Sequence, residues 1–172
     1  MKSFIKIFFI LFTFTFISSH IVSQDMTPPK PKKSETLDML MGVWVAEPYQ
    51  MFGATWTDEA NHYMHHNDQY MFIEIKGKSD KGQTYTATII INPSSDGSFT
   101  GHGFDDWGGV STMTGTTKGN HISAMVKSMW GSESRDIEIT GDKAVHKLVW
   151  TMKGSDGKDQ VTNMTLTYNK KK

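Results

Sequence analysis

Cysteine is absent from this chain of 172 residues, and arginine occurs only once, at Arg135. Without cysteine, the chain can form no disulfide and cannot carry a lipid attached through a cysteine. The fold must therefore be held by side-chain packing and by the backbone hydrogen bonds of a sheet.

The chain also has no excess of one sign of charge and no long hydrophobic run. The chain has 18 basic and 18 acidic residues, so it has no concentrated basic face for a phosphate backbone, and we expect no nucleic-acid partner. The longest apolar run, residues 7–17, is 11 residues long, whereas a membrane-spanning helix needs about 20. We therefore expect no membrane span in the mature protein.

The N-terminus has the three parts of an export signal. Lys2 and Lys6 provide a basic start, the apolar run follows, and small residues precede a predicted cleavage after Ser23. We predict a signal peptide over residues 1–23 and a mature chain of 16 basic and 18 acidic residues. A bacterial periplasmic or secreted location follows from this prediction.

Residues 24–33 (QDMTPPKPKK) contain three prolines and three lysines and show no apolar periodicity. We predict a solvated, flexible leader over 24–33, followed by one domain over 34–172, which is the usual size for a single core. Within Ser34–Met41, Leu37, Leu40 and Met41 share a helical face, which predicts a short helical turn that plugs an apolar space.

Four segments alternate between apolar and polar residues, a pattern typical of strands with one buried and one wet face. They are Thr84–Asn92, Arg135–Thr140, Lys143–Lys153 and Thr162–Tyr168. Turn-forming pairs separate these and other short β runs, and no long helical segment interrupts them. The turn pairs are Lys81-Gly82, Asp96-Gly97, Gly108-Gly109, Gly119-Asn120, Gly141-Asp142 and Asp156-Gly157. We predict an all-β, antiparallel up-and-down barrel of about 8–10 strands, its end closed by the helical turn.

A helical turn followed by Gly42-Val43-Trp44 and a series of hairpins resembles the calycin superfamily, in particular lipocalins, fatty-acid-binding proteins and lipocalin-like bacterial secreted proteins. The resemblance implies a cavity for a hydrophobic or planar ligand. It also implies that Trp44 packs across the closed end beneath a basic side chain from the last strand. Because the only arginine lies well before the end, that role falls to Lys170 or another lysine.

The residues that face inward in such a barrel are the candidate ligand-binding set. They are Tyr85, Arg135, His146, Trp150, Met152, Met164 and Tyr168. Methionine adapts to irregular ligands, and arginine suits a ligand carboxylate through two parallel hydrogen bonds. His146 and Arg135 share the inward face, where a buried polar group needs a partner. These side chains could equally form an ordinary filled core.

Three histidines, His62, His65 and His66, form the densest imidazole cluster. We expect no resident cofactor, because zinc sites usually need three or four protein ligands and no cysteine is present. The alternative left open is a transition metal or haem held by these histidines, since on a strand His62 and His66 would face the same side.

A glycine-rich segment, residues 101–109, holds His102, Asp105 and Asp106. Its glycines predict a turn or a barrel rim, where aspartate is ordinary. The leading functional prediction is a binding protein for a small hydrophobic or planar molecule. An enzyme that uses His146, or His102 with Asp106, as an acid/base pair is the second hypothesis. A filled barrel that contacts another protein is the third.

Overall fold

The structure is a computed structural model, which describes Lys30 and residues 34–172. The predicted signal peptide, its cleavage after Ser23 and nearly all of the predicted leader lie outside the described residues. The elements are α2 (Glu35–Met39), β1 (Gly42–Ala46), β2 (Tyr49–Met51), β3 (Ala54–His65), β4 (Tyr70–Ser79), β5 (Thr84–Pro93), β6 (Ser98–Asp105), β7 (Val110–Lys118), β8 (His121–Ser128), β9 (Gly131–Thr140), β10 (Lys143–Lys153) and β11 (Asp159–Lys170). Within the described part of the chain, no helix has the length and apolar character needed to cross a bilayer.

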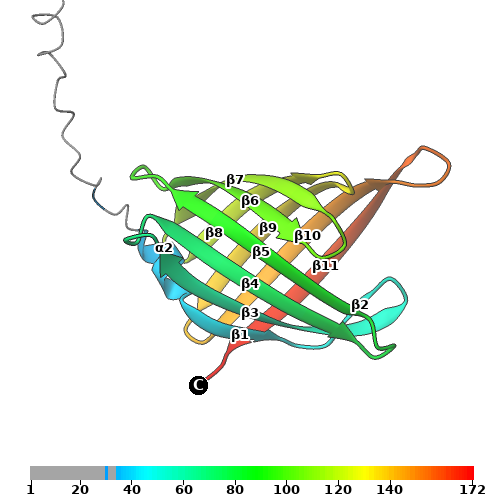
Figure 1. Cartoon of the computed structure of the whole chain (residues 1–172), viewed down its shortest axis with the longest axis horizontal. Coiled ribbons are helices and arrows are strands. Elements are labelled where there is room, and N and C mark those ends of the chain that lie inside the picture. The colour runs from blue at the N-terminus through cyan, green and yellow to red at the C-terminus, as the bar shows by residue number, and fades with distance from the viewer. Residues whose placement is uncertain (1–29, 31–33) are drawn as a thin grey trace, which may run out of the picture. The chain divides into compact units, whose positions relative to one another are not determined.

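The strands form one closed antiparallel barrel (Figure 1). Each strand from β3 to β10 pairs with the next, and β1 closes the wall by pairing with both β11 and β3. Since β1 and β2 follow one another along the same edge of β3, the wall has ten strand positions. The predicted up-and-down barrel of 8–10 strands with a short helix is confirmed.

The four predicted strands and the predicted helical turn all form where expected. Lys143–Lys153 is β10, Thr84–Asn92 lies within β5, and the other two predicted strands lie within β9 and β11. The six turn-forming pairs all fall between consecutive strands. Alternation locates these strands because each has one side against the interior and one in water.

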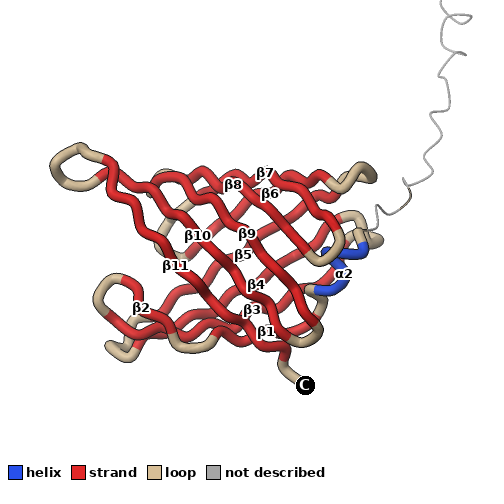
Figure 2. The backbone as a smooth tube through the Cα atoms, turned by 180° about the vertical axis from the view of Figure 1, so that it is seen from behind, coloured by secondary structure: helices blue, strands red, loops and turns tan. Residues whose placement is uncertain are grey.

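The helix α2 closes one end of the barrel. Ser34 caps the helix, its Oγ accepting a hydrogen bond from Leu37 N at 3.4 Å. Leu37 and Leu40 are buried, and Thr36 Oγ1 donates to Gly119 O at 2.7 Å. Figures 1 and 2 place α2 at the end opposite to β2 and the β10–β11 hairpin tip.

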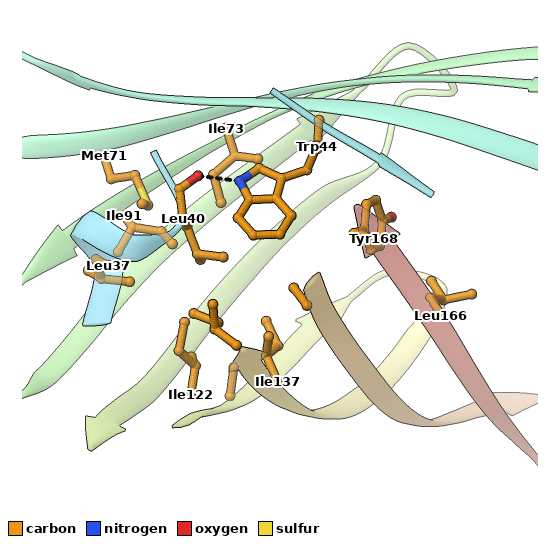
Figure 3. Close-up of a cluster of buried hydrophobic side chains, with 14 of the residues drawn as sticks. Leu37, Leu40, Trp44, Met71, Ile73, Ile91, Ile122, Ile137, Leu166 and Tyr168 are labelled. Carbon is orange, nitrogen blue, oxygen red and sulfur yellow. Dashed lines mark hydrogen bonds between the residues drawn. The ribbon is translucent and has the colours of Figure 1, made fainter. Parts of the chain in front are cut away.

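Trp44 lies beneath this plug and is 1% exposed. Its Nε1 donates to Leu40 O at 2.7 Å, so the tryptophan ties α2 to the barrel wall (Figure 3). Isoleucines, leucines, one methionine and one phenylalanine from most of the strands fill the space around it. They include Met71, Ile73, Ile91, Phe99, Ile122, Ile137, Ile139 and Leu148. This half of the barrel is a packed hydrophobic core.

A one-residue bulge separates β1 from β2. In β1, Gly42 pairs with His62 and Trp44 with Ala60, whereas in β2 Tyr49 pairs with Trp56. The register therefore shifts by one residue, with Glu47 and Pro48 taking up the extra length, as in a β-bulge. Beyond the bulge, β2 pairs with β3 alone. On the other side, β11 pairs with β1 only through its last residues, from Tyr168 to Lys170. We call the unpaired boundary between β2 and β11 the seam.

Candidate functional site

The half of the barrel away from α2 holds a cavity of about 410 Å³. Its lining comes from the ends of the strands that lie farthest from the helix, and from the β2–β3, β6–β7 and β8–β9 turns. A cavity of this size lies within the range of small-molecule sites, roughly 300–1,000 Å³. The barrel is thus filled in one half and hollow in the other.

Aromatic side chains form the entrance, here named the aromatic mouth and defined by Phe52, Trp107, Trp130 and Trp150. Phe52 meets Trp150 edge to face, with ring centroids 5.6 Å apart. Trp107 contacts Tyr85 at 5.2 Å in the same geometry. Phe52, Trp107 and Trp130 are each about half exposed. Rings at a cavity edge provide flat apolar area for a planar ligand at little entropic cost.

A polar floor, defined by Tyr49, Asp58, Glu133, Arg135 and Tyr168, lies where the cavity meets the core. Asp58 is 8% exposed and its Oδ2 accepts hydrogen bonds from two hydroxyls, Tyr49 Oη at 2.7 Å and Tyr168 Oη at 3.3 Å. The other oxygen, Oδ1, is buried and has no hydrogen-bond partner among the described residues. An unmade hydrogen bond of this kind is costly.

Burial shifts the pKa values of this group. Desolvation raises the pKa of Asp58, and the two tyrosine hydrogen bonds oppose that rise. Burial likewise raises the pKa of Tyr49 and of Tyr168, and the nearby Asp58 carboxylate adds to both effects. The pKa of Tyr85 rises to about 12, first from burial and then from the carboxylate of Asp105. The hydroxyls therefore stay protonated and act as donors.

Gly77 on β4 makes room for Asp58. A Cβ atom at this glycine would lie 2.5 Å from Asp58 Oδ1, which is closer than such atoms approach. Gly77 pairs with Asp58 across β3 and β4, so the carboxylate lies directly over the glycine. The position of the acidic group therefore depends on a residue without a side chain.

Arg135 and Glu133 form an ion pair on β9. Arg135 Nε lies 2.6 Å from Glu133 Oε1, and the two side chains are 25% and 18% exposed. Burial disfavours the charge on Arg135, but the Glu133 carboxylate, together with smaller contributions from Tyr168 and Tyr85, outweighs burial and raises the pKa of the guanidinium. The charge is thus retained and largely balanced inside the barrel.

His146 lies beside the floor rather than in the cavity lining. Its ring packs on Tyr168, with centroids 4.7 Å apart, and its Nδ1 is buried without a hydrogen-bond partner in the described chain. Burial, followed by the charge of Arg135 and the neighbouring His62, lowers the pKa of His146 well below its usual range. The imidazole is therefore neutral.

Six of the seven predicted ligand-binding residues line this cavity. They are Tyr85, Arg135, Trp150, Met152, Met164 and Tyr168. The seventh, His146, faces inward as expected but is placed deeper, against Tyr168. The structure thus brings the predicted set together from β5, β9, β10 and β11.

The three clustered histidines do not converge. His62 points inward on β3 and is 8% exposed, while His65 and His66 are exposed, with ring centroids 4.3 Å apart. The expectation that His62 and His66 share a side fails because β3 ends at His65 and His66 begins a left-handed turn at φ +52°. Among the described residues, no group of three or more histidine, aspartate or glutamate side chains could hold a metal ion.

The glycine-rich segment forms the end of β6 and a turn, as its composition predicts. Asp105 Oδ1 accepts hydrogen bonds from Trp107 N at 3.0 Å and Gly109 N at 2.7 Å, which holds the turn. Asp106 Oδ1 accepts from Thr86 N at 3.1 Å, and His102 is exposed. His102 and Asp106 therefore do not meet in the cavity.

At the closed end, the position of Lys170 matches the expectation from the calycin resemblance. Lys170 Nζ lies 5.4 Å from the centre of the Trp44 ring and 3.4 Å from Met39 O. A cation over the face of an indole is attracted by its π electrons. The lysine thus takes the place that the resemblance assigns to a basic side chain.

Three residues of the floor were not predicted: Tyr49, Asp58 and Glu133. A signal for Asp58 was available, since Trp56, Asp58, Ala60 and His62 share one face of a strand. Tyr49 could not be found in the same way, because the bulge at Glu47–Pro48 changes the inward positions from even to odd numbers.

Comparisons with known proteins identify the fold alone. No protein-family model and no curated protein sequence matches the chain. The crystal structure of Rv2717c from M. tuberculosis is similar, with a TM-score of 0.61 and 13% identity over 81% of this chain and 99% of that one. A de novo designed fluorescence-activating β-barrel aligns at a TM-score of 0.43 and 12% identity, over 81% of this chain and 100% of the design. The chain therefore shares its antiparallel barrel fold with Rv2717c.

Proposed function

We propose that this protein binds a small hydrophobic or planar molecule inside its barrel, and that it does so as an exported, periplasmic or secreted member of the lipocalin-like group. The observation that carries the proposal is the hollow half of the barrel, about 410 Å³ in volume, with an aromatic mouth and a polar floor. A filled barrel acting only through its outer face would have no need of such a lining.

The lining matches an amphipathic ligand. The rings of the mouth offer stacking surfaces, and Met152 and Met164 provide adaptable apolar contacts along the wall. At the floor, Glu133 engages only the Nε of Arg135, so the other N–H groups of the guanidinium are left for a polar ligand group. A ligand with a flat apolar body and one polar end would satisfy both regions.

Naphthol is a suitable first probe, because four of the five tryptophans line the cavity and their fluorescence should respond to it. We expect saturable quenching by naphthol and a matching heat of binding. Met164→Trp should fill the cavity and abolish the signal while the protein remains folded. Met125→Trp, on the exposed outer face of β8, is the control and should bind as wild type. Equal binding by the two variants would contradict the proposal.

Arg135 provides a second test of the same site. Its guanidinium is the only basic group that lines the cavity among the described residues, and Glu133 occupies its Nε. We expect Arg135→Gln to weaken naphthoic acid far more than naphthol, because only the acid carries a carboxylate for the remaining N–H groups. Equal losses of affinity for the two probes would show that Arg135 does not contact the polar end of the ligand.

An acid/base enzyme is the second candidate function, and Asp58 is the observation in its favour. A buried carboxylic acid with a raised pKa, held by two tyrosine hydroxyls beside a cavity, is a usual arrangement for proton transfer. Small molecules released from the protein after purification from its native host can be incubated with wild type and with Asp58→Asn. Chemical change with wild type alone would favour the enzyme over the carrier.

A further inference from the structure

The outer edge of β11 has a stretch without a neighbouring strand, and the exposed residues of this stretch are not part of the cavity lining. From Asp159 to Thr165, β11 pairs only with β10, because its pairing with β1 is confined to Tyr168, Asn169 and Lys170 and the bulge separates it from β2. Residues 159–163 and Thr165 are all exposed. In Figures 1 and 2 the β10–β11 hairpin extends past the neighbouring strands at this end.

The backbone groups along this edge have a fixed direction. Lys170 N donates to Asp142 O, on the β10 side, whereas Glu47 N donates to Thr167 O from the opposite side. The backbone N–H and C=O groups of successive residues point to opposite sides of a strand, and the β10–β11 register has no interruption that would change this order. The N–H and C=O groups of Val161, Asn163 and Thr165 therefore point away from β10, into solvent.

The side chains along the edge lack the usual protection against strand pairing. Residues 160–167 (QVTNMTLT) contain no charge and no proline, and threonine and valine favour β structure. Natural edge strands are usually blocked by lysine, proline or a bulge in the edge itself. Two exposed valines, Val149 and Val161, add apolar surface beside the edge.

We propose that the β11 edge pairs with the same edge of a second copy of this chain, in an antiparallel, two-fold symmetric arrangement. Asn163 is the middle one of the three outward-pointing residues. With the two-fold axis at this position, Asn163 would face Asn163 of the second copy and Val161 would face its Thr165. Each such pair exchanges two backbone hydrogen bonds. No like charges oppose one another within this segment, so the edge is complementary to itself.

The expected dimer depends on concentration, because an edge alone buries less surface than a standard interface. Sedimentation velocity of the mature protein, from micromolar to millimolar concentration, should show a monomer–dimer equilibrium. Asn163→Lys and Asn163→Asp should each weaken it by at least about tenfold, since each variant opposes two like charges across the two-fold axis. Mixing the two variants should restore the dimer, because the opposed charges are then opposite.

Thr114→Lys and Thr114→Asp are matched controls, because Thr114 is exposed on β7, a strand paired on both sides. They should dimerise as wild type, and circular dichroism should show that all four variants are folded. Three outcomes would overturn the proposal: a wild type that stays monomeric throughout, Asn163 variants that dimerise as well as wild type, or no rescue on mixing. If the protein were monomeric at all concentrations, the partner of this edge would be a strand from a different protein.

Discussion

The two halves of this barrel share their strands but differ in what fills them. Around α2, one tryptophan, Trp44, is buried among isoleucine, leucine, methionine and phenylalanine side chains. At the other end, the remaining four tryptophans surround a hollow with a carboxylate and an ion pair at its base. The difference teaches that one set of strands can hold both a packed hydrophobic core and an open cavity lined by aromatic and charged side chains.

Trp44→Ala should have the largest effect on that division. The indole is almost wholly buried and donates to Leu40 O, so truncation should cost about 3–5 kcal/mol of unfolding free energy in urea. Trp107→Ala, which removes a half-exposed ring at the mouth, should cost much less and reduce naphthol quenching instead. Similar stability losses for the two variants would contradict the separation.

His62 should make the packed half sensitive to acid. Burial lowers its pKa to about 4, whereas in the unfolded chain it titrates near pH 6.5. As the pH falls from about 6.5 to about 4, the unfolded chain gains a proton that the folded protein excludes, so stability falls. Wild type should lose about 3 kcal/mol more than His62→Gln over this range in urea titrations. Parallel pH curves for the two proteins would refute this.

Phe52→Gly should give the smallest change in stability. Phe52 adopts φ +52°, a left-handed conformation that is strained for an aromatic residue but free for glycine. Loss of the exposed ring and release of this strain should nearly cancel, within about 1 kcal/mol of wild type. Naphthol affinity should still fall, because the edge-to-face contact with Trp150 is lost. A large destabilisation would place part of the fold's stability at the mouth.

Much of the architecture was predictable, because alternation in β5, β10 and β11 records which face meets the interior. Six of seven predicted ligand-binding residues reach the cavity for the same reason. The partnership of Tyr49 with Asp58 was not predictable, since it depends on the register between β2 and β3 and on an extra residue at Glu47–Pro48. Nor could alternation distinguish the hollow half from the filled one, because it reports direction and not volume.

The bulge at Glu47–Pro48 has a consequence for how the barrel could change over evolution. The seam arises from the number of residues between Ala46 and Tyr49 and not from their chemistry. In a chain one residue shorter at this point, β1 and β2 would form a single strand, and Gln50 would lie opposite Thr165. This strand could pair with β11 along its whole length, and every side chain that lines the cavity would be kept. Insertions and deletions here, more than substitutions, would therefore decide whether this barrel has a free edge.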